Sequence, residues 1–313
     1  MNTGTAAVMP VVAFAARAIR APFLSVTAIA LAIGFALAAR DAVALPWLTI
    51  GVAALGALLA HAGANVLNDW ADELNGSDRA NEERISPFTG GSRLIQEAQV
   101  DAATTRRLAW SLLVAASLCG LALLPSLGAP LLAFGAAGLG LAWAYSSPPL
   151  QLMARGLGEI AVGLAWATVI AGADFVVRGA ASPTPWLAGA GFALMIVALL
   201  WVNEFPDVAA DRQAGKRNAV VRLGAYAATR AYPLLPLSAA GTTLLAIIAG
   251  ALPAAAAIAC AGLLPALAAA RRLRQALGAR GEARHATLTT AVKANLAAVH
   301  AYGILLAAAL LLA

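Results

Sequence analysis

Two clusters of acidic residues, each at the end of an apolar stretch, contain the side chains best suited to chemistry. The first cluster includes Asp69, Asp72 and Asp78, and the second includes Asp207 and Asp211. The chain has only 15 acidic residues in 313, so their crowding in two places indicates a shared task. Mg²⁺ takes oxygen ligands and is often held by one or two carboxylates together with substrate phosphates. We therefore predict that these five aspartates are metal ligands.

Polar residues recur at helical spacing in both clusters. Residues three or four positions apart share one face of a helix, and ionisable side chains at membrane depth usually face the interior of a bundle. The simplest arrangement brings the two faces together across a cavity. The predicted faces are His61, Asn65, Asn68 and Asp72 in the first segment and Asn203, Asp207 and Asp211 in the second.

Arg212 and Lys216 follow the second acidic cluster in the sequence, and Arg155 lies just before the apolar stretch that begins at residue 157, on the same predicted side of the membrane. Several carboxylates in one cavity would repel one another unless cations were present. Metal ions together with a diphosphate explain both signs of charge, because guanidinium and ammonium groups hold the phosphate oxygens that metals do not neutralise. We therefore predict that these three cations bind a diphosphate substrate.

Composition places the chain in a membrane. It is 61% hydrophobic and 12% charged, with a mean hydropathy of +0.80, whereas a soluble domain has about 25% charged residues. Runs of about 20 apolar residues predict transmembrane helices. We predict an all-α, polytopic membrane protein whose single domain, residues 1–313, is a bundle of nine such helices around a central cavity. The predicted spans are residues 22–39, 45–67, 108–126, 129–146, 157–177, 185–205, 231–250, 252–270 and 292–312.

Lysine and arginine predict the orientation of these spans. With the N-terminus inside, all 21 basic residues except Arg40 and Arg178 fall in cytoplasmic segments, as the positive-inside rule expects. The cavity would then open to the cytoplasmic side of an inner (plasma) membrane, with the loops of the site in the cytoplasm. The basic residues are explained by topology, so the isoelectric point near 10 does not indicate nucleic-acid binding.

Several motifs together resemble those of the UbiA superfamily of intramembrane prenyltransferases, and the resemblance extends over the whole chain. Asn-Asp-Trp-Ala-Asp at 68–72 with Asp78, followed by the spaced residues Asn203, Asp207, Asp211 and Lys216, are the most specific. Further matching segments are Arg20-Ala-Pro-Phe, Tyr145-Ser-Ser-Pro-Pro149, Arg155-Gly-Leu-Gly-Glu159 and Val221-Arg-Leu-Gly224. The spacing from Asp72 to Asp78 resembles the branch that acts on 1,4-dihydroxy-2-naphthoate.

The resemblance implies an Mg²⁺-dependent enzyme that transfers a polyprenyl group from its diphosphate to a small aromatic acceptor, as in menaquinone biosynthesis. Two Mg²⁺ ions would join the diphosphate to the two aspartate motifs. The lipid tail would lie in the bilayer, and no obligate protein partner is indicated. The implied catalytic residues are Asn68, Asp72, Asp207 and Asp211. The implied substrate-binding residues are Arg20, Asn65, Tyr145, Arg155, Asn203, Arg212 and Lys216.

Two kinds of alternative stay open. The acceptor could instead be 4-hydroxybenzoate, a tetrapyrrole, a sugar phosphate or a glyceryl lipid. The chain could also be a cation-coupled transporter, a class that often has acidic sites at mid-membrane in broken helices. Here the acids lie at helix ends beside basic loops, which favours a phosphate-binding enzyme.

Overall fold

The computed structural model describes residues 10–40 and 44–313, and every regular element in these ranges is a helix. The predicted all-α class is confirmed. The long helices are α2 (Leu24–Ala39), α3 (Trp47–Asn75), α5 (Ala102–Leu127), α6 (Pro130–Ser146), α7 (Gly158–Arg178), α8 (Thr184–Gln213), α10 (Leu234–Ile248), α11 (Leu264–Gly278) and α12 (Gly281–Leu312). The shorter elements are α1 (Val11–Ala18), η1 (Ala21–Phe23), α4 (Ser77–Ala80), η2 (Leu152–Ala154), α9 (Ala219–Ala231) and η3 (Ala254–Leu263).

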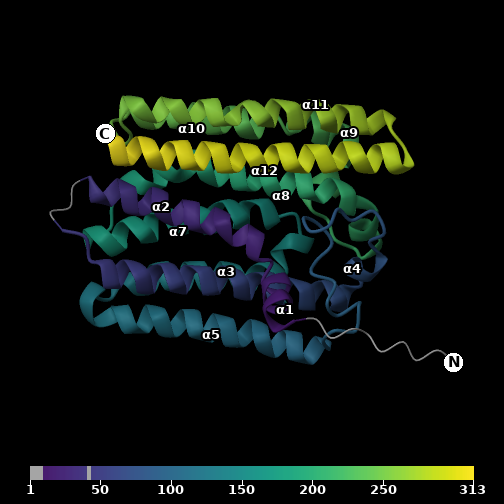
Figure 1. Ribbon diagram of the computed structural model, residues 1–313, viewed down its shortest axis with the longest axis horizontal. Coiled ribbons are helices and arrows are strands. Elements are labelled where there is room, and N and C mark those ends of the chain that lie inside the picture. The colour runs from purple at the N-terminus through teal and green to yellow at the C-terminus, as the bar shows by residue number, and fades with distance from the viewer. Residues whose placement is uncertain (1–9, 41–43) are drawn as a thin grey trace.

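The long helices lie side by side along one axis of the molecule (Figure 1). Helices α10, α11 and α12 form one side, α3 and α5 form the opposite side, and α2, α7 and α8 lie between them. Helix α4 packs against α8, and α4 and α9 lie at the same end of the bundle (Figure 1). The ends of α3 and α8, which carry the two acidic clusters, therefore meet.

Length and composition of the helices agree with a membrane protein. Within the described residues, seven helices are long and apolar enough to cross a membrane, or up to eight if the bent pair α9–α10 is one span. That pair bends by 59°, and α6 is apolar but has only 17 residues. Each of the nine predicted segments overlaps helical structure, and the count of nine crossings stays a prediction. The predicted cytoplasmic N-terminus falls on residues 1–9, outside the described residues.

Small residues allow the helices to pack closely, as they do in membrane bundles. A side chain at Gly34 of α2 would collide with the backbone of Ile170 in α7, and one at Gly262 of η3 would collide with the backbone of Tyr302 in α12. The largest buried apolar cluster joins α2, α7, α8, α10, η3 and α12. This closely packed half of the bundle includes α8, which carries the second acidic face.

Local sequence determines where α3 ends. Gly76 has φ of +80°, a left-handed conformation that glycine adopts readily. The chain then forms α4, which brings Asp78 back toward α8. Asn75 accepts a hydrogen bond from the Ser77 backbone N–H at 2.9 Å, which further stabilises this turn.

Candidate active site

A polar chamber of about 130 Å³ lies where the ends of α3 and α8 meet α4, α9 and the loop that follows α4. It is the site that the two acidic faces predict. Its charged lining residues are Arg20, Asp72, Asp78, Glu204, Asp207, Asp211 and Lys216, and its neutral polar ones include Asn68, Ser77, Asn81, Thr89, Tyr145, Asn203 and Asn218.

Lys216 joins the two acidic faces. Its Nζ lies 2.6 Å from Asp72 Oδ1 and 3.3 Å from Asp211 Oδ1. Asn218 Nδ2 donates to the other oxygen of Asp211 at 2.8 Å. Burial alone lowers the pKa of Lys216, but the Asp72 and Asp211 carboxylates raise it above its ordinary value. Lys216 is therefore a permanent cation between two carboxylates that stand on different helices.

Asn68 and Arg20 form the wall of the chamber on the α3 side. Asn68 Nδ2 donates to Asp72 Oδ2 at 3.1 Å, and Asn68 Oδ1 accepts from Arg20 at 3.1 Å. Arg20 has φ of +51°, which is uncommon for a residue with a side chain and often marks functional sites. Burial alone lowers its pKa, but the Asp69, Asp78 and Asp72 carboxylates raise it.

The two other aspartates of the first cluster differ in their surroundings. Asp69 does not line the chamber, because it pairs with Arg20 and accepts the Ser92 backbone N–H at 3.2 Å. Asp78 lines it, and its buried Oδ2 has no hydrogen-bond partner within the described chain. Burial and the carboxylates of Asp72 and Asp69 raise the pKa of Asp78 to about 8. Asp78 thus has an oxygen free for a cation.

The loop after α4 covers the carboxylates with backbone rather than with side chains. Gly91 has φ of +71°, and a Cβ at this position would collide with Asp78 Oδ2. From the same region Asn81 Nδ2 donates to Asp207 Oδ1 at 2.7 Å. This contact connects the loop directly to α8.

Several of these contacts involve residues that sequence reasoning missed, namely Asn81, Gly91, Ser92 and Asn218. Two signals were available. Gly90-Gly91 predicts a backbone that comes close to another group, and Asn218 is a favoured N-cap residue, whose Oδ1 indeed accepts from Val221 N at 2.8 Å at the start of α9. Asn81 and Ser92 carry no such signal, since their partners lie far away in the sequence.

Two predicted substrate-binding cations lie outside the polar chamber. Arg155 and Arg212 are exposed, and neither lines the chamber. The Arg155 guanidinium donates to the Pro149 carbonyl at 2.6 Å, and its own carbonyl accepts from Arg222 at 2.5 Å. The sequence predicted Arg155 from its side of the membrane and Arg212 from its position next to an acidic cluster, but both side chains are exposed and lie outside the chamber.

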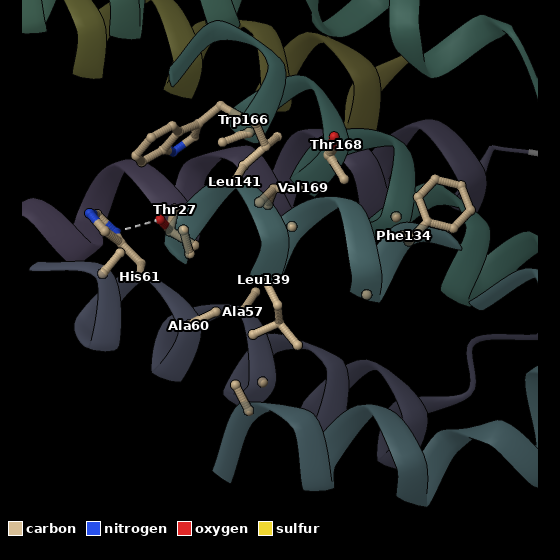
Figure 2. Close-up of a pocket in the computed structure, with 18 of the residues that line it drawn as sticks. Thr27, Ala57, Ala60, His61, Phe134, Leu139, Leu141, Trp166, Thr168 and Val169 are labelled. Carbon is tan, nitrogen blue, oxygen red and sulfur yellow. Dashed lines mark hydrogen bonds between the residues drawn. The ribbon is translucent and has the colours of Figure 1, made fainter. Parts of the chain in front are cut away.

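A second, larger chamber of about 650 Å³ adjoins the polar one and has a mainly apolar lining. It is enclosed by α2, α3, α5, α6, α7 and α8, and part of its wall is shown in Figure 2. Asn65 and His61 lie on this wall, about two and three helical turns before Asp72. The residues that line both chambers are Arg20, Asn68, Phe88, Tyr145, Leu200 and Asn203.

The acidic ends of both predicted faces therefore line the same chamber. Their carboxylates do not surround a single point there. In the part of the chain that the structure describes, no group of three Asp, Glu, His or Cys side chains is arranged to hold a metal ion. The chamber does have five carboxylates against two basic side chains among these residues. The buried oxygens Asp78 Oδ2, Asn203 Oδ1 and Glu204 Oε2 have no partners among them either. This excess of oxygen donors suits a cation that a substrate helps to bind.

Comparison with known families decides the affiliation of the chain. The model of the UbiA prenyltransferase family matches residues 24–291, which is most of the sequence. The chain belongs to this family. The resemblance predicted from the aspartate motifs is thereby confirmed.

Relatives in the family include enzymes with assigned substrates. A 1,4-dihydroxy-2-naphthoate octaprenyltransferase of Haemophilus influenzae is 31% identical over 202 residues, which cover 61% of this chain and 62% of the relative. UbiA prenyltransferase domain-containing protein 1 of Dictyostelium discoideum is 26% identical over 208 residues, covering 64% and 61%. The matches thus span less than two thirds of these relatives' lengths.

Solved structures share the fold. A digeranylgeranylglyceryl phosphate synthase is matched with a TM-score of 0.63 at 15% identity, covering 96% of this chain and 99% of the other. A UbiA homologue from Archaeoglobus fulgidus bound to DMAPP and Mg²⁺ is matched with a TM-score of 0.59 at 14% identity, covering 94% and 99%. At these identities the likeness establishes the helical UbiA fold.

Proposed function

We propose that this chain is an Mg²⁺-dependent prenyltransferase that moves a polyprenyl group from its diphosphate to an aromatic acceptor, 1,4-dihydroxy-2-naphthoate, in menaquinone biosynthesis. Family membership and the relative from Haemophilus influenzae support the reaction and the acceptor. The Archaeoglobus homologue bound to DMAPP and Mg²⁺ supports the metal and the donor.

One observation carries the proposal: the polar chamber and the apolar chamber share a rim. A prenyl diphosphate has a strongly anionic head and a long hydrocarbon tail. The head requires cations and hydrogen-bond donors, which Arg20, Lys216 and Asn68 provide at the rim and in the polar chamber. The tail requires an apolar cavity, and the neighbouring chamber of about 650 Å³ supplies it.

The residues of the polar chamber suit Mg²⁺. Asp72, Asp78, Asp207 and Asp211 would hold it together with diphosphate oxygens, as Mg²⁺ usually binds through a few carboxylates and phosphates. When bound, the metal neutralises charge that develops on the departing diphosphate. The unpartnered Oδ2 of Asp78 is the clearest free ligand among the described residues. Asp69 was also predicted as a ligand, and in this arrangement it orients Arg20 instead.

In the reaction the bond between prenyl C1 and the diphosphate oxygen breaks, and its electron pair leaves with the diphosphate. Arg20 and Lys216 stabilise that negative charge from fixed positions. A ring carbon of the acceptor then forms a bond to C1 with a π-electron pair, and the ring regains aromaticity when that carbon loses its proton, to water or the released diphosphate, or loses its carboxyl group as carbon dioxide. Tyr145, Asn203 and Phe88 stand at the rim, where C1 would lie. The apolar wall limits capture of the allylic cation by water.

The same proposal includes the location of the protein. Nine membrane crossings, with the polar chamber open to the cytoplasmic side of the inner membrane, are supported by the distribution of lysine and arginine. A single cysteine at the exposed Gln213, in a variant that lacks Cys119 and Cys260, tests it. An impermeant thiol reagent should label inside-out vesicles but not sealed right-side-out cells. Labelling of the cells from outside would contradict this orientation.

The decisive experiment measures product formation by the purified protein in detergent. It is incubated with Mg²⁺, a polyprenyl diphosphate and a panel of acceptors, and the products are identified by mass. We expect prenylated naphthoate product and equimolar pyrophosphate, both abolished by EDTA. A product with 4-hydroxybenzoate, a tetrapyrrole, a sugar phosphate or a glyceryl lipid instead would keep the reaction and correct the acceptor. Absence of any product would contradict the proposal, and family membership already favours it over a cation-coupled transporter.

A further inference from the structure

A small hydrogen-bonding patch interrupts the wall of the apolar chamber. His61 Nδ1 lies 2.8 Å from Thr27 Oγ1, and the His61 ring meets the Trp166 ring edge-on, with 5.1 Å between centroids. All three side chains line the chamber. Figure 2 shows them together at one end of the view, whereas Phe134 lies at the other end. We define the His61–Trp166 patch as Thr27, His61 and Trp166.

The patch offers two unused hydrogen-bonding groups. Trp166 Nε1 is buried, and neither it nor His61 Nε2 has a hydrogen-bond partner within residues 10–40 and 44–313. Hydroxyl groups elsewhere on the same wall are satisfied by their own helices. Thr168 donates to Leu164 O at 2.8 Å, and Ser117 donates to Leu113 O at 2.9 Å. Buried groups without partners among the residues that the structure describes also occur at the rim, at Asn203 Oδ1 and Arg20 Nε, but away from the rim the unused capacity of the wall lies in this patch.

A hydrocarbon tail is the wrong occupant for the patch. Covering an indole N–H and an imidazole nitrogen with methylene groups would strip them of water and leave both unpaired, which costs free energy. The α6 wall of the chamber has no such cost, since its residues Phe134, Gly135, Gly138 and Leu139 present only apolar groups. The tail is thus better placed along α6 than along α7.

The position of the patch matches a ring that reacts at the rim. His61 lies two helical turns before Asn68 on α3, or about 10 Å along the helix. An aromatic acceptor whose reacting carbon faces the rim residue Asn68 would direct the opposite edge of its reacting ring toward His61 and Trp166. In 1,4-dihydroxy-2-naphthoate that reacts at C2, this edge carries the 4-hydroxyl group. A hydroxyl or carboxylate oxygen there would accept the indole N–H and pair with the imidazole.

We infer that the His61–Trp166 patch binds a polar oxygen of the aromatic acceptor and divides the apolar chamber into an acceptor side, at α2, α3 and α7, and a tail side, at α5 and α6. The inference rests on the proposed prenyl transfer to an aromatic ring. Thr27 is a positioning residue, because it holds the imidazole through Nδ1 and leaves Nε2 available to a ligand in the chamber.

The test measures binding, so that it does not depend on turnover. Titration calorimetry in detergent compares 1,4-dihydroxy-2-naphthoate with unsubstituted naphthalene, each with and without Mg²⁺ and a non-reactive prenyl thiolodiphosphate. Trp166→Phe keeps the ring and removes only the N–H. We expect it to weaken the dihydroxynaphthoate about fivefold, the loss of one hydrogen bond, and to leave naphthalene unchanged. His61→Leu should do the same.

Thr168→Val is the matched control, because it removes a hydroxyl from the same helix and chamber that is already bonded to its own backbone. It should leave the affinity for both probes unchanged. Equal weakening of both probes by Trp166→Phe, or weakening of the thiolodiphosphate alone, would overturn the inference, as would absence of binding of dihydroxynaphthoate to the wild type. If product formation fails while Trp166→Phe still weakens dihydroxynaphthoate selectively, the prenyl-transfer proposal fails and the binding patch stands.

Discussion

The polar and the apolar chamber are formed by different kinds of interaction. The polar chamber is small, lies at helix ends and loops, and is held by charge pairs and amide hydrogen bonds such as Asn81 to Asp207 and Lys216 to Asp72. The apolar chamber is about five times larger and is formed by helix faces rich in glycine and alanine. Changes in the first should act through charge, and changes in the second should act through volume and shape.

The largest effect is expected from loss of a carboxylate in the polar chamber. Asp72→Ala and Asp207→Ala should each lower kcat at least ~100-fold, because each removes a proposed oxygen ligand of the metal and metal sites are sensitive even to outer ligands. Steady-state rates over a Mg²⁺ titration measure this loss, and the folded state is verified by size-exclusion chromatography.

Glu82→Ala is the control, since Glu82 is an exposed acid on the loop after α4 and does not line the chamber. It should retain wild-type activity. Activity near the wild-type level in Asp72→Ala would contradict the proposed role of Asp72 as a metal ligand, and with it the idea that the polar chamber acts through charge.

A somewhat smaller effect, on stability and on the KM for the donor, is expected from Lys216→Ala. The change leaves Asp72 and Asp211 facing each other without their cation, and breaking a buried pair costs about 3–5 kcal/mol. We expect a lower melting temperature, partial recovery of that temperature with Mg²⁺, and a ~10-fold higher KM for prenyl diphosphate. Thermal unfolding with and without Mg²⁺ separates this result from simple misfolding, in which the metal would not help.

The apolar chamber should respond to volume and not to charge. Gly138→Leu on α6 has room for its Cβ, yet it fills the tail side of the chamber. We expect kcat/KM to fall ~10-fold for long polyprenyl diphosphates, because buried overpacking costs about 1–3 kcal/mol, and to change little for DMAPP.

Gly140→Leu is a matched partner on the same helix, with open space around its Cβ and no contact with the chamber. It should leave the preference for tail length unchanged. If both variants lose activity equally with all donors, the tail does not lie along α6.

The smallest effect is expected at Arg155. The sequence analysis predicted a phosphate contact at Arg155, but the side chain is exposed and bonded to a backbone carbonyl. Since surface substitutions usually change stability by less than about 0.5 kcal/mol, Arg155→Lys should keep kcat and KM within ~2-fold. A strong rise in KM for prenyl diphosphate would restore the sequence-based prediction and extend the polar site outward.

The sequence by itself determined the class, the helices and the main polar faces. Long apolar runs can satisfy their backbone groups in a membrane only as helices, so the segments 108–126 and 292–312 were predictable and fall within α5 and α12. The spacing of Asn68 and Asp72, and of Asn203, Asp207 and Asp211, placed these residues on one face of each helix. All five line the polar chamber.

Only the tertiary structure decided which charged groups share that chamber. Lys216 and Arg155 looked alike in the sequence, yet one is buried between two carboxylates and the other is exposed, because the direction in which a side chain leaves a turn depends on contacts with distant segments. Likewise Asn81 reaches Asp207 across 126 positions, and His61 meets Trp166 from another helix. Such contacts follow from how helices pack, and local spacing carries no information about them.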